Sequence, residues 1–177
     1  ANTTGQRSVA IGYQALDANT TADNNTAFGY TALAANTTGT RNTAVGNDAG
    51  VAVTTGDDNT FIGHDSGDAV TTASDNTAVG SYSLTSATTG ASNVAIGYSS
   101  LESNTTASNN TAVGYQALLG NTTGEVNSAF GSQALYTNTT GYGNTAIGKG
   151  ALYTNNGNNN TAVGHEALEL NTTGEEN

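Results

Sequence analysis

The stretch Asn42-Thr43-Ala44-Val45-Gly46 decides the fold, because the pattern N-T-A-V-G returns along the whole chain at a fixed interval. Each copy ends on a glycine that follows the previous one by 17 residues, except for a last interval of 16. An apolar residue directly precedes each glycine, and an asparagine stands four residues before it, with Ser8 the one exception. A period this regular indicates a repeat protein. The repeat glycines are Gly12, Gly29, Gly46, Gly63, Gly80, Gly97, Gly114, Gly131, Gly148 and Gly164, and the asparagines are Asn25, Asn42, Asn59, Asn76, Asn93, Asn110, Asn127, Asn144 and Asn160.

The period predicts an all-β fold. Helical repeats need about 33–47 residues, and Asn, Thr and Gly are poor helix formers. The alternation of T-A-V-G is typical of a strand. We expect a second strand through the A-L segment towards a second motif, N-T-T-G, found for example at 2–5, 36–39, 121–124 and 171–174. Asn and Gly are expected at the turns because both tolerate positive φ.

The prediction is therefore a parallel β-solenoid (β-roll) with one coil per 17 residues and about ten coils. Ten coils at about 4.7–4.9 Å make a rod roughly 50 Å long. Residues 1–177 form a single solenoid domain, which is a segment of a longer array or a subunit that stacks on others. Identical coils place like residues above one another, so we expect the asparagines to form amide ladders.

The two faces of the strand suggest an oligomer. Thr43 and Val45 point to one side, while Ala44 and Gly46 point to the other. The small residues indicate that something approaches closely, and the Val, Ile or Phe side chains are costly to leave in water. Burying both faces requires another chain, and three chains close a ring naturally. A monomeric solenoid with Val and Leu inside and Ala and Gly outside is the alternative.

Two stretches carry a resemblance to a known family. Ser8-Val9-Ala10-Ile11-Gly12 and Asn93-Val94-Ala95-Ile96-Gly97 resemble the N-S-V-A-I-G motif of the YadA-like head of trimeric autotransporter adhesins. The resemblance implies a left-handed parallel β-roll and a homotrimer, displayed on bacterial surfaces, that binds host matrix proteins or other cells. The full repeat, with G-Y-Q-A-L and N-T-T-G, also resembles arrays in bacterial and phage tail-fibre-like proteins.

Composition excludes several classes of function. The chain has 177 residues, 35% of them hydrophobic, and a net charge of −11 with only three basic residues, Arg7, Arg41 and Lys149. It therefore lacks the basic surface that nucleic acid requires, and no apolar run is long enough for membrane insertion. There is no cysteine, and the two histidines lie about six coils apart. We predict that the protein is not an enzyme and has no cofactor or metal.

Two groups of side chains are candidate contact surfaces. The residue after each repeat glycine forms a column in which Tyr13 and Tyr30, and Tyr98 and Tyr115, are neighbours that could stack and grip a sugar or an apolar partner. Tyrosines packed at the coil edge with their hydroxyls in water are the plainer interpretation. The most irregular coils gather acids near His64, where Ca²⁺ could bind, but a solvated acidic turn is favoured. The acids are Asp48, Asp57, Asp58, Asp65 and Asp68, and in the same coils Gly50 and Gly67 replace Leu and Phe61 replaces Ala.

Three functions follow from these patterns. The first is an extracellular, surface-displayed or virion-borne adhesive rod, which associates with itself and binds a host surface protein or glycan. The second is a subunit that stacks end to end into a filament. The third is ice binding, suggested by the abundant threonine. A flat ice-binding strand calls for T-x-T, whereas the adjacent threonines of N-T-T-G point in opposite directions.

Overall fold

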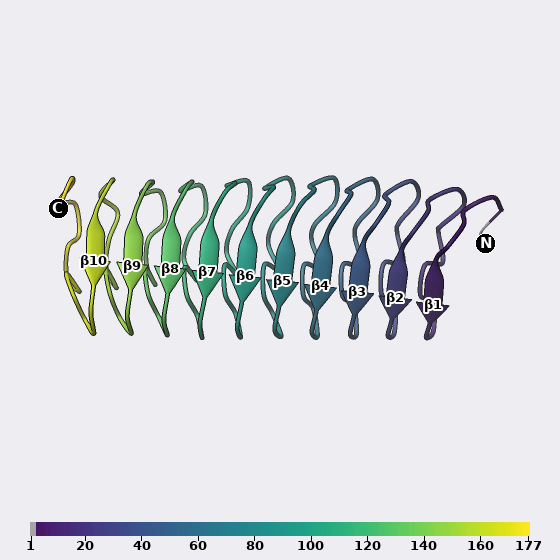
Figure 1. Cartoon of the computed structure of the whole chain (residues 1–177), viewed down its shortest axis with the longest axis horizontal. Helices are drawn as coiled ribbons and strands as arrows, with labels where there is room; N and C mark the ends of the chain where they lie inside the picture. Colours follow the sequence, from purple (N-terminus) through teal and green to yellow (C-terminus); the bar gives the residue numbers. More distant parts are fainter. Residues whose placement is uncertain (1–2) are drawn as a thin grey trace.

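The computed structural model describes residues 3–177 and shows a parallel β-solenoid with one ten-stranded sheet (Figure 1). Each strand pairs in parallel with its neighbours in the sequence, in the order β1 to β10. The register places Ala27 beside Ala44, which confirms the coil of 17 residues. Asn2, in one predicted N-T-T-G copy, lies outside the described residues. The strands are β1 (Val9–Ile11), β2 (Thr26–Phe28), β3 (Thr43–Val45), β4 (Thr60–Ile62), β5 (Thr77–Val79), β6 (Val94–Ile96), β7 (Thr111–Val113), β8 (Ser128–Phe130), β9 (Thr145–Ile147) and β10 (Thr161–Val163).

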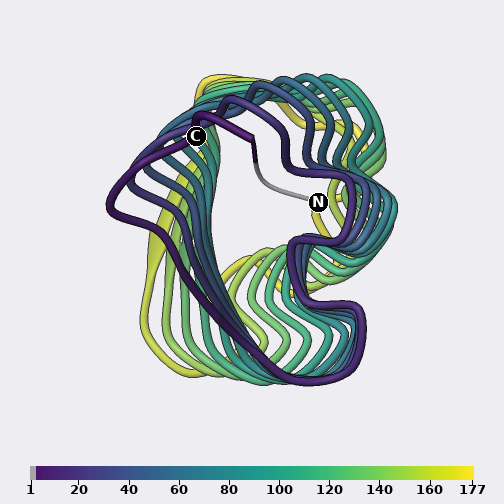
Figure 2. The same cartoon turned by 90° about the vertical axis from the view of Figure 1, so that its right-hand side faces the viewer.

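Each described coil contains one strand, so the prediction of a second strand is wrong. The backbone still bonds from coil to coil in that region: the N–H of Leu33 donates to the carbonyl of Ala49 (3.1 Å), and the N–H of Thr37 donates to that of Thr54 (3.0 Å). The chain there is not extended, because residues with positive φ interrupt it, such as Leu33 at 51°. Viewed end on, the coils repeat one path and turn gradually along the rod (Figure 2).

Leucine takes many of the positive-φ positions that we expected Asn and Gly to hold. Leu84 and Leu101 have φ of 56° and 50° and are both fully buried, whereas the asparagines of the repeat are not among the positive-φ residues. A left-handed conformation costs an L-residue about 1–2 kcal/mol. Burying a leucine side chain contributes about 1.5–3 kcal/mol, which offsets that cost.

The repeat glycines confirm that something approaches the backbone closely, and it is the next coil. Their φ values run from 131° to 150°, a range that favours glycine. A Cβ on Gly80 would lie 2.5 Å from the carbonyl oxygen of Gly97, and the same approach recurs from Gly12 to Gly148. Glycine is therefore required at these positions by the backbone conformation and by the coil spacing together.

The core lies between the sheet and the leucines. The central residue of each strand from β2 to β10 is buried, and it is alanine in every one except β4, where it is Phe61. The alternative of a solenoid with Val inside and Ala outside is therefore wrong: Ala44 is fully buried, while Val45 is partly exposed. Among residues 3–177 no helix has the length and apolar character needed to span a bilayer.

Candidate interaction surface

The outer side of the sheet carries an exposed row of apolar side chains, which we call the apolar row. It consists of the last residue of each strand, on the same side as the first. Seven of its members have exposed fractions between 38% and 67%, and Val45, Val79 and Val113 are partly exposed. The exposed members are Ile11, Phe28, Ile62, Ile96, Phe130, Ile147 and Val163. The row runs over ten consecutive strands of one rod (Figure 1).

This surface is free of acidic residues although the chain carries a net charge of −11. Strands β1 to β10 contain no charged residue at all. The residue after each repeat glycine is Tyr, Asn, Ser, His or Lys, never Asp or Glu. Acids begin immediately outside this band, for example at Asp48 on one side and Asp58 on the other. We call the outward-facing first and last residues of the strands the sheet face, and the residues after the repeat glycines lie along its margin.

Tyrosines stack along one margin of the sheet face. The predicted neighbours do stack: the ring centroids of Tyr13 and Tyr30 lie 5.2 Å apart at 12°, and those of Tyr98 and Tyr115 lie 5.6 Å apart at 13°. Tyr82 joins His64 to Tyr98 by edge-on contacts of 5.3 and 5.7 Å. Sequence reasoning missed Tyr82 because it lies one residue out of phase with the column, where a positive φ of 59° redirects its side chain.

The repeat asparagines form the predicted ladder inside the coil. The backbone N–H of Asn42 donates to Oδ1 of Asn25 (2.9 Å), and Nδ2 of Asn42 donates to the carbonyl of Gly56 in the next coil (2.7 Å). The pattern recurs from Asn25 to Asn160, and all nine side chains are buried. Each side-chain amide thus bonds two backbone groups of the following coil, an N–H through Oδ1 and a carbonyl through Nδ2, which makes this ladder structural.

A second ladder runs through the asparagines of N-T-T-G. Nδ2 of Asn121 donates to Oδ1 of Asn104 (3.2 Å), and Nδ2 of Asn138 donates to Oδ1 of Asn121 (3.0 Å). In the irregular coils this position is Val53, Val70 or Ala87, all of them buried. The side-chain bonds of this ladder therefore begin only after these coils, at Asn104, and the buried Oδ1 atoms of Asn19 and Asn36 before them have no hydrogen-bond partner.

The irregular coils are explained by packing. The ring of Phe61 lies inside the coil, fully buried, against Gly50 and Gly67. A Cβ on Gly50 would lie 2.7 Å from Cδ2 of Phe61, and one on Gly67 would overlap the other side of the ring. Two leucines are therefore absent where one alanine has become phenylalanine, so the core volume is redistributed between neighbouring coils.

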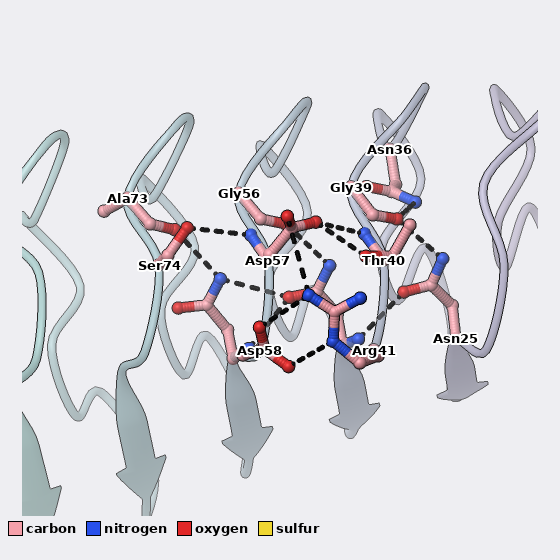
Figure 3. Close-up of polar contacts among 12 residues, drawn as sticks. Asn25, Asn36, Gly39, Thr40, Arg41, Gly56, Asp57, Asp58, Ala73 and Ser74 are labelled. Atoms are coloured by element: carbon pink, nitrogen blue, oxygen red, sulfur yellow. Dashed lines mark hydrogen bonds and ion pairs between the residues drawn. The ribbon is translucent and has the colours of Figure 1, made fainter.

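Part of the acidic group is also structural (Figure 3). Oδ1 of Asp57 accepts the backbone N–H of Thr40 (2.6 Å), and the N–H of Asp57 donates to Oγ of Ser74 (3.0 Å). Nε and Nη2 of Arg41 donate to the carboxylate of Asp58 at 2.6 and 2.8 Å. This hydrogen-bonded pair lowers the pKa of Asp58 and raises that of Arg41.

The remaining acids lie near His64 without forming a metal site. Nδ1 of His64 lies 3.1 Å from Oδ2 of Asp65. Burial, with a further contribution from the neighbouring Asp65, raises the pKa of Asp68, whose buried Oδ1 has no hydrogen-bond partner. Within residues 3–177 no three His, Asp or Glu side chains come together as metal ligands would.

Comparison with known proteins adds no relative to this description. No protein-family model matches the chain, and neither a curated protein nor a solved structure matches it.

Proposed function

We propose that the protein is a non-enzymatic structural rod that acts outside the cell as a segment of an adhesin or of a fibre shaft. In this proposal copies of the chain associate side by side through the sheet face. The observation that carries it is the apolar row, which lies exposed on ten strands free of charge.

Charge favours the same surface. Two chains of net charge −11 repel one another over most of their surfaces, and contact is least opposed where acids are missing. Burying Ile, Val and Phe side chains between chains contributes about 25 cal/mol per Å² of apolar area removed from water. Three chains around an axis would cover every sheet face in a closed ring, as the resemblance to trimeric adhesin heads also implies.

Light scattering tests this proposal with a matched pair of variants. The wild-type chain is expected to have about three times the mass of its 17.6 kDa monomer. Ile96→Glu combined with Ile147→Glu places charges on the sheet face and is expected to give monomers. Val126→Glu is the control, because Val126 is 58% exposed but lies in a turn outside the sheet. A monomeric wild-type chain, or equal dissociation of the control, would contradict the proposal.

For the binding of a host surface protein or glycan we propose the aromatic column that runs from His64 through Tyr82 and Tyr98 to Tyr115. These four rings contact one another in series along the rod. Aromatic rings with an exposed polar edge suit amphipathic partners such as sugars. Glycan-array binding by the wild-type chain, lost in Tyr98→Ala but kept in Tyr142→Ala, is the expected result.

The outward threonines favour ice binding as a second candidate. Thr43, Thr60 and Thr77 are adjacent on the sheet with partly exposed side chains, whereas the N-T-T-G threonines lie outside the strands. The residue two positions after each of these threonines, on the same side of its strand, is Val or Ile instead of a second threonine. Thermal hysteresis in solution would support this candidate, and electron microscopy separates discrete rods from end-to-end filaments.

A further inference from the structure

Six of the eight tyrosines form three stacked pairs on successive coils. Besides the pairs Tyr13–Tyr30 and Tyr98–Tyr115, the rings of Tyr136 and Tyr153 lie 4.9 Å apart at 15°. The pairs occupy two different columns, since Tyr136 and Tyr153 each follow a core leucine instead of a repeat glycine. Coil stacking thus holds pairs of phenol rings together at three places along the rod.

The paired rings are accessible to small reagents. Tyr13, Tyr30, Tyr98 and Tyr115 have exposed fractions between 47% and 63%, and Tyr136 and Tyr153 are partly buried. Each ring lies beside its partner on the next coil, so a reaction between the two is effectively unimolecular.

We propose that these three pairs are sites of oxidative cross-linking to dityrosine by a haem peroxidase with hydrogen peroxide. Each phenol gives up one electron and one proton and becomes a phenoxyl radical. The two radicals join through a new bond between carbons ortho to the hydroxyls, and each ring then moves its ortho hydrogen to oxygen to restore the phenol. Overall, two tyrosines and one hydrogen peroxide give one dityrosine and two waters.

Cross-linking would bind neighbouring coils covalently in a chain that has no cysteine. A bond from Tyr13 to Tyr30 closes a loop of 17 residues. Like a disulfide of similar span, it would restrict the unfolded chain more than the folded one. Tyr136 and Tyr153 lie outside the strands and outside the sheet face, so their cross-linking does not depend on association through the sheet face.

Tyr142 provides an internal control. It is 51% exposed, as accessible as the paired tyrosines, but contacts no other aromatic ring within residues 3–177. Tyr82 meets Tyr98 edge-on, so removing Tyr98 also isolates Tyr82. Tyr→Phe changes keep the ring and its stacking but remove the phenol that the reaction needs.

The experiment treats dilute wild-type protein with a haem peroxidase and hydrogen peroxide. Dityrosine is read by fluorescence, chain mass by a denaturing gel, and the joined residues by peptide mass spectrometry. We expect chains of monomer mass with three cross-linked peptides, joining 13 to 30, 98 to 115 and 136 to 153, in a yield independent of protein concentration.

Variants then separate the proposal from chance reaction. Tyr30→Phe, Tyr98→Phe and Tyr136→Phe together are expected to abolish dityrosine within the chain, and each alone should remove one cross-linked peptide. Tyr142→Phe should remove none. Absence of dityrosine in the wild type, a wild-type yield in the triple variant, or cross-links that use Tyr142 equally would overturn the proposal.

Discussion

The ring of Phe61 fills the space that a side chain on Gly67 would enter. A Cβ on Gly67 would overlap Cδ1 and Cε1 of the ring, although this position is leucine in most other coils. Gly50, one coil earlier, faces the other side of the ring, where an added Cβ would lie 2.7 Å from Cδ2 of Phe61. The three residues therefore form one packing unit within an otherwise repetitive core.

This unit predicts a strongly coupled set of mutations. Phe61→Ala is expected to lower the free energy of unfolding by about 3–5 kcal/mol, because it leaves a cavity the size of the ring. Gly67→Leu alone should also destabilise the protein through overlap with Phe61. Combining Phe61→Ala with Gly50→Leu and Gly67→Leu restores the consensus coil and should recover most of the loss. If denaturant titrations show that the triple variant loses the sum of the separate losses in free energy of unfolding, Phe61 does not take the place of the two leucines.

A second prediction separates backbone strain from coil spacing. Gly80 and Gly164 have almost the same φ, 133° and 134°. A Cβ on Gly80 meets the carbonyl oxygen of Gly97, whereas a Cβ on Gly164 meets, among residues 3–177, only Ala167 at 3.8 Å. Gly164→Ala should lower the free energy of unfolding by about 1–3 kcal/mol through backbone strain. Gly80→Ala should lower it further, because its Cβ also overlaps the next coil. Thermal unfolding followed by circular dichroism measures both, and equal losses would mean that the next coil imposes no constraint.

A third prediction concerns the coil that is one residue short. Oδ1 of Asn156 accepts the N–H of Thr139 (2.7 Å), its hydroxyl (2.8 Å) and the N–H of Thr140 (3.3 Å). In a regular coil the backbone carbonyl of Thr54 accepts the corresponding bonds from Thr37 and Thr38. The side-chain amide of Asn156 thus replaces the carbonyl of the missing residue.

Asn156→Ala should therefore lower the free energy of unfolding by about 1 kcal/mol, since water can replace the lost bonds at this exposed site. Asn156→Asp keeps the acceptor oxygen and should be tolerated. Asn156→Thr with one threonine inserted after it rebuilds N-T-T-G and is expected to restore stability. If this insertion does not restore the stability lost with Asn156, then the side chain of Asn156 does not replace a backbone carbonyl.

A fourth prediction follows from the raised pKa of Asp68, which results first from burial and then from Asp65. The native state then binds a proton more readily than the unfolded chain. The contribution of Asp68 to stability should therefore increase as pH falls through its raised native pKa, and the gain is complete below the unfolded value of 3.8.

Asp68→Asn should raise the unfolding temperature at neutral pH and remove this gain. Asp58→Asn is the contrasting variant, because the pKa of Asp58 is lowered by Arg41, and its contribution is lost as pH falls through that lowered value. If the stability of Asp68→Asn varies with pH as that of the wild type does, then Asp68 is not the group whose raised pKa causes the gain.

The sequence was sufficient to predict the coil, its period and its asparagine ladders, because these depend on like residues stacking upon like. It could not tell which side of the strand faces inward, since alternation in T-A-V-G is the same for either choice. In the structure Ala44 is fully buried in the core that the leucines share, and Phe61 fits there because Gly50 and Gly67 leave room for its ring.

The missing second strand has a different cause. Leu84 and Leu101 adopt positive φ against their intrinsic preference, and only the bonds and burial of the assembled coil stabilise that conformation. Local residue preferences therefore pointed to a strand there. Tyr82 was overlooked for the same reason, because its place beside Tyr98 depends on a left-handed residue in a turn.

The most direct test of the account is an inter-chain distance measurement on the sheet face. Because the chain has no cysteine, Ile96→Cys and Val126→Cys each allow one spin label per chain. Electron paramagnetic resonance should find neighbouring labels much closer together at position 96 than at position 126, since copies meet at the sheet face. Labels at position 96 that show no inter-chain coupling, or that lie farther apart than those at position 126, would contradict the account.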